Sequence, residues 1–241
     1  MKKIKTFAWM YKKLANPPCP HCDSCKVKKN GKKACGKQNY FCHNCRKQFV
    51  GHYKNHGADP KKQACVLAMH HHSSGILDIH NVLNISIVCV LSILRRHFSA
   101  IEEPHFEGRY RRVMIDEMWT FVRKRKSQKR WFWYAMCADT RQILAFQIGK
   151  RNEATCKKMF KKLAHLDIAE FCTDNWKAYK KVIPPEKHTI SKLHTQKIER
   201  QNLNFRTHNK RLARQTICFS KKDEMHYGSI KAFVKFYNDK R

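Results

Sequence analysis

The sequence predicts a mixed α/β protein in which a small cysteine-rich module and a helical segment precede an α/β domain. Six of the twelve cysteines fall within residues 19–45, and apolar residues recur with helical spacing between 60 and 98. After the break at Pro104, strand-like runs alternate with helical ones, which is the order of an α/β domain. We therefore expect three parts, which span residues 1–55, 56–103 and 104–241.

The charge balance of the chain is strongly basic. Lysine and arginine together number 51 against 18 aspartates and glutamates, which gives a formal net charge of +33. Such a charge needs a polyanionic partner: nucleic acid, an anionic membrane surface or an acidic protein. No run approaches the ~18 apolar residues of a membrane span, and residues 1–13 lack the apolar core of a signal peptide. We expect a cytoplasmic protein that uses its reduced cysteines as metal ligands or small core residues.

Two C-x-x-C pairs, Cys19/Cys22 and Cys42/Cys45, flank the segment 23–41. Each pair can form a tight turn that directs two thiolates at one ion, and two such turns complete a tetrahedral Zn²⁺ site. The segment between the pairs fits a β-hairpin with Asn30-Gly31 at its turn, so the module is predicted to be a zinc ribbon. Cys25 and Cys35 compete as ligands. A site with four thiolates has no open position, so its expected role is structural.

The second part resembles a helix-turn-helix segment. Apolar spacing predicts helices over 64–69, 76–83 and 87–97, with Asn84 in the last connection and Ser86 as a helix cap. The third helix would then be the recognition helix.

This third helix, "IVCVLSILRRH", is more apolar than a helix that reads a DNA groove usually is. A small helical bundle that joins domains or subunits is therefore the alternative to DNA recognition. The side chains expected to be free for DNA are Ser86, Ser92, Arg95 and Arg96. The triplet 70–72 consists of three consecutive histidines, which cannot share one helix face, and we interpret it as a solvated stretch.

The third part begins with three predicted strands and continues with alternating helices and strands. The strands are "RRVMIDEMWTFV", "WFWYAMCAD" and "QILAFQIG", with the basic turn "RKRKSQKR" between the first two. A helix over 154–165, the strand "EFCT", a helix through Tyr179, a strand near 188–191 and a final helical stretch follow. This order is compatible with an RNase H-like sheet. The middle strand is apolar on both faces, so its Trp131, Trp133 and Tyr134 are predicted to be core residues.

Acidic residues are scarce in this domain, and three of them stand out. Asp116 lies among apolar residues in the middle of the first strand, where burial is costly unless the carboxylate is paired or binds metal. Its neighbour Glu117 points the other way, and we expect it to face solvent. Asp174 directly follows the strand "EFCT", at the strand end where open α/β sheets place their sites.

Glu199 is the only carboxylate between Glu186 and Asp223, a stretch crowded with lysine and arginine. Asn202 and Arg206 follow it at positions that share its helix face. A structural alternative exists for two of the three acids: Asp174 could cap the next helix, and Glu199 could pair with Arg206.

The motifs "IDEMW", "TDNW" and "KIERQNLNFR" resemble those of insertion-sequence-1 family transposases. The runs "RKRKSQKRWFWYA", "SKLHTQ" and "FSKKDEMHYGSIKAFVKFYN" resemble the same family, and so does "CPHC…YFCHNCRKQF" near the N-terminus. The resemblance covers roughly residues 17–240 and is strongest from Arg111 onward.

This resemblance implies a DDE-type DNA transposase with an RNase H-like catalytic domain. Its triad carries over to Asp116, Asp174 and Glu199, and the spacing between the last two is the one that the family pattern requires. Three carboxylates can hold two Mg²⁺ (or Mn²⁺) ions, which suit an in-line displacement at phosphorus. Asn202 and Arg206 occupy further family positions, and Arg206 is expected to contact a phosphate or to orient Glu199.

The expected partners are double-stranded DNA at the element ends and at the target. Two ends must be processed together, so a homodimer or larger oligomer is expected, in a prokaryotic nucleoid and without a membrane. The residues expected to hold DNA are Arg95, Arg96, Lys192, Lys197, Arg200, Lys210, Arg211 and Arg214. The alternative function is that of a catalytically inert DNA-binding regulator built from the zinc ribbon and helix-turn-helix.

Overall fold

The computed structural model describes residues 16–51, 56–123, 129–190, 192–214, 216 and 218–241, and only the backbone of 56 and 192–195. The described chain divides into two compact units. The first unit comprises residues up to Ala68 together with Leu77–Val90, and the second comprises Met69–Ile76 with Leu91–Arg241. We refer to the second as the α/β unit. The three-part division into 1–55, 56–103 and 104–241 stays a prediction.

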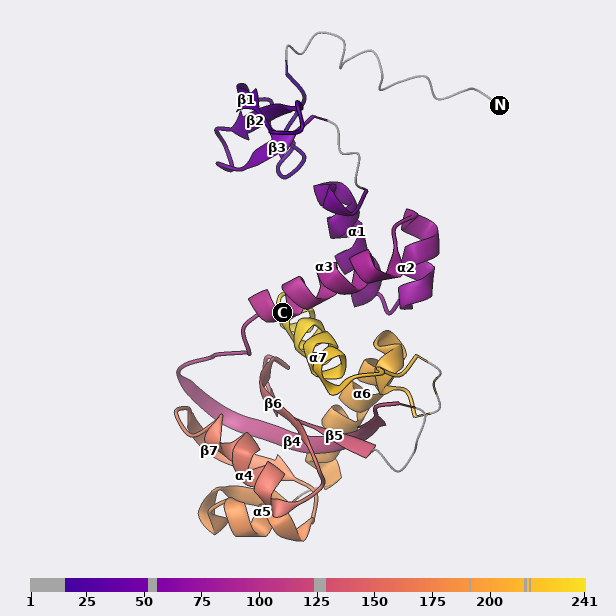
Figure 1. The fold of residues 1–241 in the computed structure, drawn as a ribbon. Helices are drawn as coiled ribbons and strands as arrows, with labels where there is room; N and C mark the ends of the chain where they lie inside the picture. Colours follow the sequence, from indigo (N-terminus) through magenta and orange to yellow (C-terminus); the bar gives the residue numbers. More distant parts are fainter. Residues whose placement is uncertain (1–15, 52–55, 124–128, 191, 215, 217) are drawn as a thin grey trace, which may run out of the picture. The chain divides into compact units, whose positions relative to one another are not determined.

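The first unit begins with a three-stranded antiparallel sheet (Figure 1). Its strands are β1 (Val27–Lys32), β2 (Gln38–Cys42) and β3 (Gln48–Val50), in the spatial order β1-β2-β3. The buried core of this sheet is small and consists of Cys19, Val27, Cys42 and Phe49. Two of its four members are thus cysteines, so little apolar burial is available to stabilise the module without a metal.

The predicted hairpin turn at Asn30-Gly31 is wrong. Both residues lie within β1, where the pairing with β2 shifts register between Lys29 and Lys32. Gly31 has a φ of +68°, a conformation that a β-bulge requires as readily as a tight turn does. The chain reverses after the strand instead, where Lys33 donates its backbone N–H to the carbonyl of Lys37 at 2.9 Å.

Three helices follow at the positions that apolar spacing predicts. They are α1 (Pro60–His71), α2 (Ile76–Leu83) and α3 (Ile87–Ala100), after a 3-10 turn at His56–Ala58. Asn84 has a φ of +49°, and the hydroxyl of Ser86 accepts the N–H of Cys89 at 3.2 Å, so both local predictions are confirmed. No single described helix is long and apolar enough to cross a membrane. The helices α2 and α3 would reach that length only as a pair, and the chain bends by 115° between them.

The α/β unit is built on a five-stranded mixed sheet with the order β6-β5-β4-β7-β8. The antiparallel strands are β4 (Arg109–Phe121), β5 (Lys129–Cys137) and β6 (Ile143–Gly149), whereas β7 (Asp167–Thr173) and β8 (His188–Ile190) run parallel to β4. The helices are α4 (Glu153–Lys161), α5 (Lys177–Val182), α6 (Lys192–His208) and α7 (Asp223–Asn238). Short 3-10 turns lie at Pro185–Lys187 and Lys210–Leu212. The predicted α/β class is confirmed, and the basic turn predicted over 123–130 lies mostly outside the described residues.

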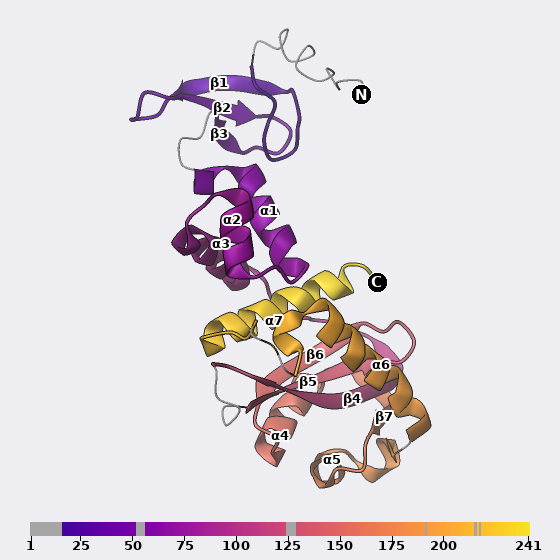
Figure 2. The same ribbon diagram turned by 90° about the vertical axis from the view of Figure 1, so that its right-hand side faces the viewer.

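Helices cover both faces of this sheet (Figure 2). Val113 and Ile115 of β4 pack in one core with residues of α4 and α5, whereas Met114 and Met118 pack in another with residues of α6 and α7. Alternation along β4 therefore sends Asp116 toward α6 and Glu117 toward α5. Both faces of the strand are thus covered by helices, so neither acidic side chain lies on an open face of the sheet.

The interior of the sheet is aromatic, as the middle strand predicts. Trp133 and Tyr134 are fully buried, and Trp131 is half-buried. Phe205 of α6 packs edge-on against the ring of Tyr134, with ring centroids 5.1 Å apart. This contact, with the fully buried Ile198, holds α6 on the sheet and fixes the face that it turns toward β4.

Candidate functional site

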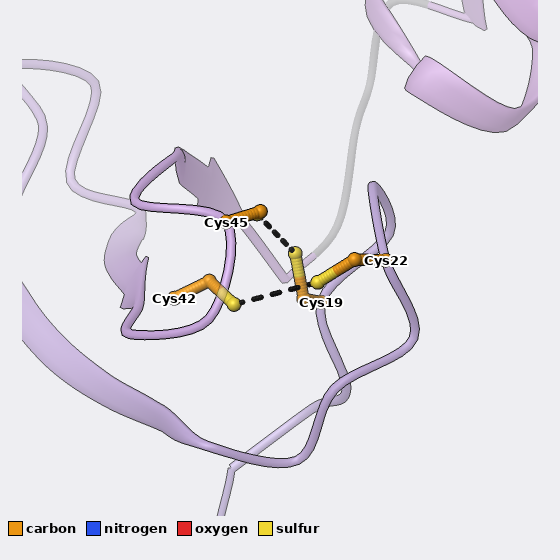
Figure 3. Close-up of side chains that lie close together, drawn as sticks. All are labelled: Cys19, Cys22, Cys42 and Cys45. Carbon is orange, nitrogen blue, oxygen red and sulfur yellow. Dashed lines mark hydrogen bonds between the residues drawn. The ribbon is translucent and has the colours of Figure 1, made fainter.

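Four cysteine thiols converge in the first unit, which we call the cysteine cluster: Cys19, Cys22, Cys42 and Cys45 (Figure 3). Their sulfur atoms all lie within 4.8 Å of one another, and the Cys19–Cys45 and Cys22–Cys42 Sγ atoms are each 3.6 Å apart. Tetrahedral Zn²⁺ with Zn–S bonds of about 2.3 Å would separate its sulfur ligands by about 3.8 Å. The four side chains therefore fit Zn²⁺, and the predicted ligand set converges as expected.

The alternative ligands do not join this cluster. Cys25 and Cys35 are both exposed, and within the described residues the four cysteines above are the only such group of possible metal ligands. The backbone N–H of His21 points at the sulfur of Cys19 at 3.4 Å, and the amide of Asn44 lies 3.8 Å from that of Cys22. Such donors stabilise thiolates, which is the form that binds zinc.

A second group of side chains, which we call the carboxylate site, comprises Asp116, Asp174 and Glu199. Asp116 is half-buried in β4, the central strand. Met114 pairs with Cys172 in the parallel register of β4 and β7, so two residues further along each strand Asp174 follows beside Asp116. Asp174 thus lies just beyond the carboxyl end of β7, where its side chain is exposed.

Asn202 joins α6 to this strand. Its side-chain amide donates from Nδ2 to Oδ2 of Asp116 at 2.5 Å, while its Oδ1 accepts the hydroxyl of Tyr134 at 2.9 Å. The carboxylate of Asp116, which needs a donor, sets which way the amide points, and the Tyr134 hydroxyl, which also lies 3.1 Å from the carbonyl oxygen of Ile198, holds its other end. Because Glu199 lies three residues before Asn202, the same contact brings the glutamate-bearing face of α6 toward Asp116.

The electrostatics of Asp116 reflect this gathering of acids. The pKa of Asp116 is raised to about 6: burial is the main cause, the charges of Asp174 and Glu199 add to the rise, and the hydrogen bond from Asn202 opposes it. Asp174 and Glu199 are therefore each close enough to act on the charge of Asp116. Within the described residues they do not converge to the tight spacing of the cysteine cluster.

The structural alternatives for two of the acids have different outcomes. Oδ1 of Asp174 accepts the N–H of Trp176 at 3.0 Å, so this carboxylate does contribute to the turn before α5. Its second oxygen remains toward solvent, 3.8 Å from a guanidinium nitrogen of Arg151. Among the described residues Glu199 forms no ion pair within 4.0 Å, and the predicted pairing with Arg206 is not seen.

Arg206 lies close enough to Asp116 for the carboxylate to raise its pKa, although burial and Arg214 lower it overall. Its Nε atom is buried and has no hydrogen-bond partner among the described residues. A guanidinium in this position can offer a donor to an anionic ligand.

The prediction that Glu117 faces solvent is wrong. Its side chain is only 2% exposed, and its carboxylate oxygens accept hydrogen bonds from the hydroxyl of Tyr179 at 2.5 Å and from Nε–H of Arg151 at 2.6 Å. Burial raises the pKa of Glu117 to about 7, and both hydrogen bonds oppose that rise. Glu117 is buried because α5 covers the face of β4 on which its side chain lies.

Arg151 is a residue that the sequence did not reveal. Its guanidinium carbon lies 5.1 Å from the ring centroid of Trp131 and 4.9 Å from that of Trp176. Held there by Glu117, it reaches Asp174. Arg151 thereby links Glu117 of β4 with Asp174, which follows the neighbouring strand β7. This contact depends on the register of the sheet, and no local motif indicates it.

The basic residues predicted to hold DNA differ in exposure. Lys197, Arg200, Lys210 and Arg214 are exposed, and so are Arg95 and Arg96, whereas the side chain of Lys192 lies outside the described residues. Arg211 is turned inward: its guanidinium donates to the hydroxyl of Ser220 at 3.0 Å, so it helps to pack its own segment. Arg95 also lies 3.8 Å from Glu224.

Comparison with known proteins gives a consistent picture for the second half of the chain. A model of the IS1 transposase family matches residues 112–238, a stretch that holds Asp116, Asp174 and Glu199. Insertion element iso-IS1n protein InsB of Shigella dysenteriae is 40% identical over 121 residues, which are 50% of this chain and 92% of that protein. Insertion element IS1 protein InsB of Shigella sonnei is 38% identical over 112 residues, 46% of this chain and 85% of that protein.

Among solved structures, a simian T-cell lymphotropic virus intasome in complex with PP2A regulatory subunit B56 gamma aligns at a TM-score of 0.33 and 15% identity. The alignment covers 61% of this chain and 59% of that one, a likeness too slight to bear on function. The family match spans more than half of the chain and includes the strands and helices that carry the carboxylate site. The chain therefore belongs to the IS1 transposase family.

Proposed function

We propose that this chain is a DDE-type DNA transposase that binds the terminal inverted repeats of its mobile element. It cleaves the 3′ ends of the element and joins them to target DNA by metal-dependent phosphoryl transfer. Asp116, Asp174 and Glu199 are the metal-binding triad of an RNase H-like domain. Membership of a transposase family supports DNA as the substrate, and the carboxylate site supports the chemistry.

The observation that carries the proposal is the hydrogen bond between Asn202 and Asp116. It ties the helix that bears Glu199 to the central strand, next to the strand end that bears Asp174. Three segments far apart in sequence thus deliver three carboxylates and little other acid to one edge of the sheet. A purely structural role would not explain why a buried carboxylate, Asp116, lies near two further carboxylates.

The donor set suits Mg²⁺ or Mn²⁺. Carboxylate oxygens are hard ligands, and a divalent cation would offset both the burial that mainly raises the pKa of Asp116 and the nearby charges of Asp174 and Glu199. When bound, two such ions activate the attacking water or 3′-hydroxyl and stabilise the departing 3′ oxygen. The exposed side of Asp174 and Glu199 leaves this edge accessible to a DNA strand.

The residues of the chain then have distinct tasks. Asn202 orients Asp116, because its amide is itself held by Tyr134. Arg151 steadies Asp174 from the side of the sheet. Arg206 offers its unpartnered Nε to a phosphate oxygen, which a planar guanidinium does better than an ammonium.

Surrounding cations hold the DNA backbone. Lys197, Arg200, Lys210 and Arg214 are exposed and would bind phosphates, which predicts an affinity that falls steeply with salt. The cysteine cluster with Zn²⁺ and the helices α1–α3 would form the part that recognises the element ends. Because two ends react together, a dimer or larger assembly on DNA completes the proposal.

The test is a strand-transfer assay with Mg²⁺ and DNA that carries the element ends. Asp174→Asn keeps the hydrogen bond to Trp176 but removes the charge, and end joining should fall by about a hundredfold or more. Asp167→Asn is the matched control, since Asp167 begins the same strand and pairs with Arg109 on the surface. DNA binding without metal should be unchanged in both variants.

Three outcomes separate the possibilities. End joining at the wild-type rate by Asp174→Asn would remove Asp174 from the triad. Equal loss in Asp167→Asn would indicate a general defect in folding. If the wild type bound the ends and left them uncut at every Mg²⁺ concentration, the inert DNA-binding regulator would be the better description.

A further inference from the structure

A cavity of about 460 Å³ lies within the α/β unit among α6, α7 and the turn after α1. Gln201 and Phe205 of α6 line it, and both lie well around the helix from Glu199, since successive residues advance by about 100°. The cavity is therefore distinct from the carboxylate site. Neither the proposed metal chemistry nor the cysteine cluster uses it.

The walls of the cavity combine basic and aromatic side chains. The basic ones include Lys210, Lys240 and Arg241, and the aromatic ones include Phe205, Phe236 and Tyr237. Among the described residues that line it there is no acidic side chain. A ligand that is both anionic and aromatic would match these walls.

Gln201 adds a specific requirement. It is only 2% exposed, and its Oε1 accepts the hydroxyl of Tyr237 at 3.1 Å. Its Nε2 is buried and has no hydrogen-bond partner among the described residues. A buried amide donor without a partner is uncommon, so the cavity calls for a ligand that presents an acceptor to it.

We propose that this cavity binds one unpaired nucleotide of a DNA strand. A nucleobase offers a flat face to an aromatic ring and acceptor atoms along its edge, and its phosphate lies near enough to be held by surrounding cations. Phe236 provides the ring, Gln201 the donor at the base edge, and Lys210 and Lys240 the charges for the phosphate. The proposal rests on DNA as the ligand and not on the metal site.

Both His71 and Lys240 contact the ring of Phe236. His71 stacks on it with ring centroids 4.7 Å apart, and the ammonium of Lys240 lies 3.9 Å from its centroid. Lys240 is exposed, and an exposed cation–π contact is weaker than a base–aromatic stack. A base can therefore displace the ammonium, which is then free to pair with the phosphate of the same nucleotide.

Other ligands use fewer of these features. A phosphate alone would leave the ring of Phe236 and the amide of Gln201 without a contact. An apolar side chain would leave the amide of Gln201 without an acceptor and would take the surrounding cations out of water, which is costly. An unpaired nucleotide offers a base to the ring of Phe236, an acceptor to the amide of Gln201 and a phosphate to the surrounding cations.

The experiment measures binding of the full chain, without divalent metal, to a short labelled duplex at one fixed salt concentration. Three forms are compared: a blunt duplex, the same duplex with a single-stranded thymidine tail, and one with an abasic tail of equal length. The backbone charge of the two tails is the same, so only the bases differ. Wild type should bind the thymidine tail about tenfold more tightly than the abasic tail.

Phe236→Ala and Gln201→Leu should each lose that preference while they keep the wild-type affinity for the blunt duplex. Leu203→Ala is the control, because Leu203 lies on α6, is 58% exposed and does not line the cavity. Equal binding of the two tails by the wild type would overturn the proposal, whatever the variants do. So would a preference for the thymidine tail that survives in both variants.

Thymidine monophosphate identifies the source of the nucleotide. It should compete with the tail only weakly, since it lacks the neighbouring phosphates. Competition as strong as that of the tail itself would assign the cavity to free nucleotides and overturn the assignment to DNA. Because no cleavage is measured, these results do not depend on the carboxylate triad.

Discussion

The cysteine cluster and the carboxylate site bring their side chains together in opposite ways. In the cluster, four sulfur atoms already lie within 4.8 Å of one another, and all come from the one short stretch Cys19–Cys45. In the carboxylate site, Asp116 is anchored by Asn202, whereas Asp174 and Glu199 remain exposed. A closed ligand set suits a structural ion, and an open one suits ions that must also meet a substrate.

The difference also concerns what each region needs in order to fold. The ribbon has a core of four buried residues, two of which belong to the cysteine cluster. The α/β unit has two large cores, one on each face of its sheet, and none of the three carboxylates is needed to fill them. We therefore expect the first region to need its metal in order to fold. We expect the α/β unit to fold without metal and to hold the carboxylates in place for metal binding.

Metal removal should give the largest contrast. A strong zinc chelator, or Cys42→Ser, should unfold residues 16–51 and leave the α/β unit intact, because structural zinc contributes about 10 kcal/mol to such modules. Hydrogen exchange followed by mass spectrometry would measure this segment by segment. Cys25→Ser, which changes an exposed cysteine outside the cluster, should exchange like the wild type. Equal protection of the ribbon with and without chelator would contradict the structural role.

Acid should destabilise the α/β unit through histidines rather than through its carboxylates. Burial, with Arg211 as a further cause, lowers the pKa of His70 to about 3 and that of His226 to about 4. Asp223 opposes the shift of His226, while His71 and His97 add to that of His70. Since these folded-state values lie below the ordinary 6.5, the stability they provide is complete above about pH 6.5 and is lost as pH falls toward 4.

At pH 5 the expected loss is about 2 kcal/mol for each of the two residues, relative to pH 7. Urea unfolding of the α/β unit, monitored by tryptophan fluorescence, would measure it at both pH values. His226→Gln should remove about a third of the acid sensitivity, because burial also lowers the pKa of His71 to about 4. His105→Gln should leave it unchanged, since His105 is largely exposed. An unaltered pH dependence in His226→Gln would show that other groups carry the effect.

The same histidines show where sequence reasoning fell short. The triplet 70–72 was expected to be solvated, but His70 is 7% exposed and bonds through Nε2 with the hydroxyl of Ser229 at 3.1 Å. That burial comes from α7, which is the last helix of the chain and lies far from His70 in the sequence. Glu117 is buried in the same way, by a helix that lies far from it in the sequence, since α5 covers it.

Predictions that depended on local spacing fared better. Paired C-x-x-C motifs fix their own geometry, so the four cysteines were found from sequence alone, and the helix ends at Asn84 and Ser86 followed from local chemistry. Asp116 could be singled out because a carboxylate is unusual in a buried strand. Two residues around it could not be found in this way: Tyr134, which bonds with Asn202, and Arg151, which pairs with Glu117, because only the strand register and the docking of α6 place them.

The smallest effect should come from Asn202→Leu, which sharpens the comparison at the one fixed point of the open site. The variant loses the hydrogen bonds to Asp116 and Tyr134 while it keeps a similar volume, so stability should fall by only about 1–2 kcal/mol. End joining should then need roughly tenfold more Mg²⁺, as is typical when a residue that orients a metal ligand is lost. Gln196→Leu, an exposed change on the same helix, is the control in a Mg²⁺ titration of strand transfer. If Asn202→Leu showed the wild-type Mg²⁺ dependence, Asp116 would need no orientation by α6, and the carboxylate site would be as self-sufficient as the cysteine cluster.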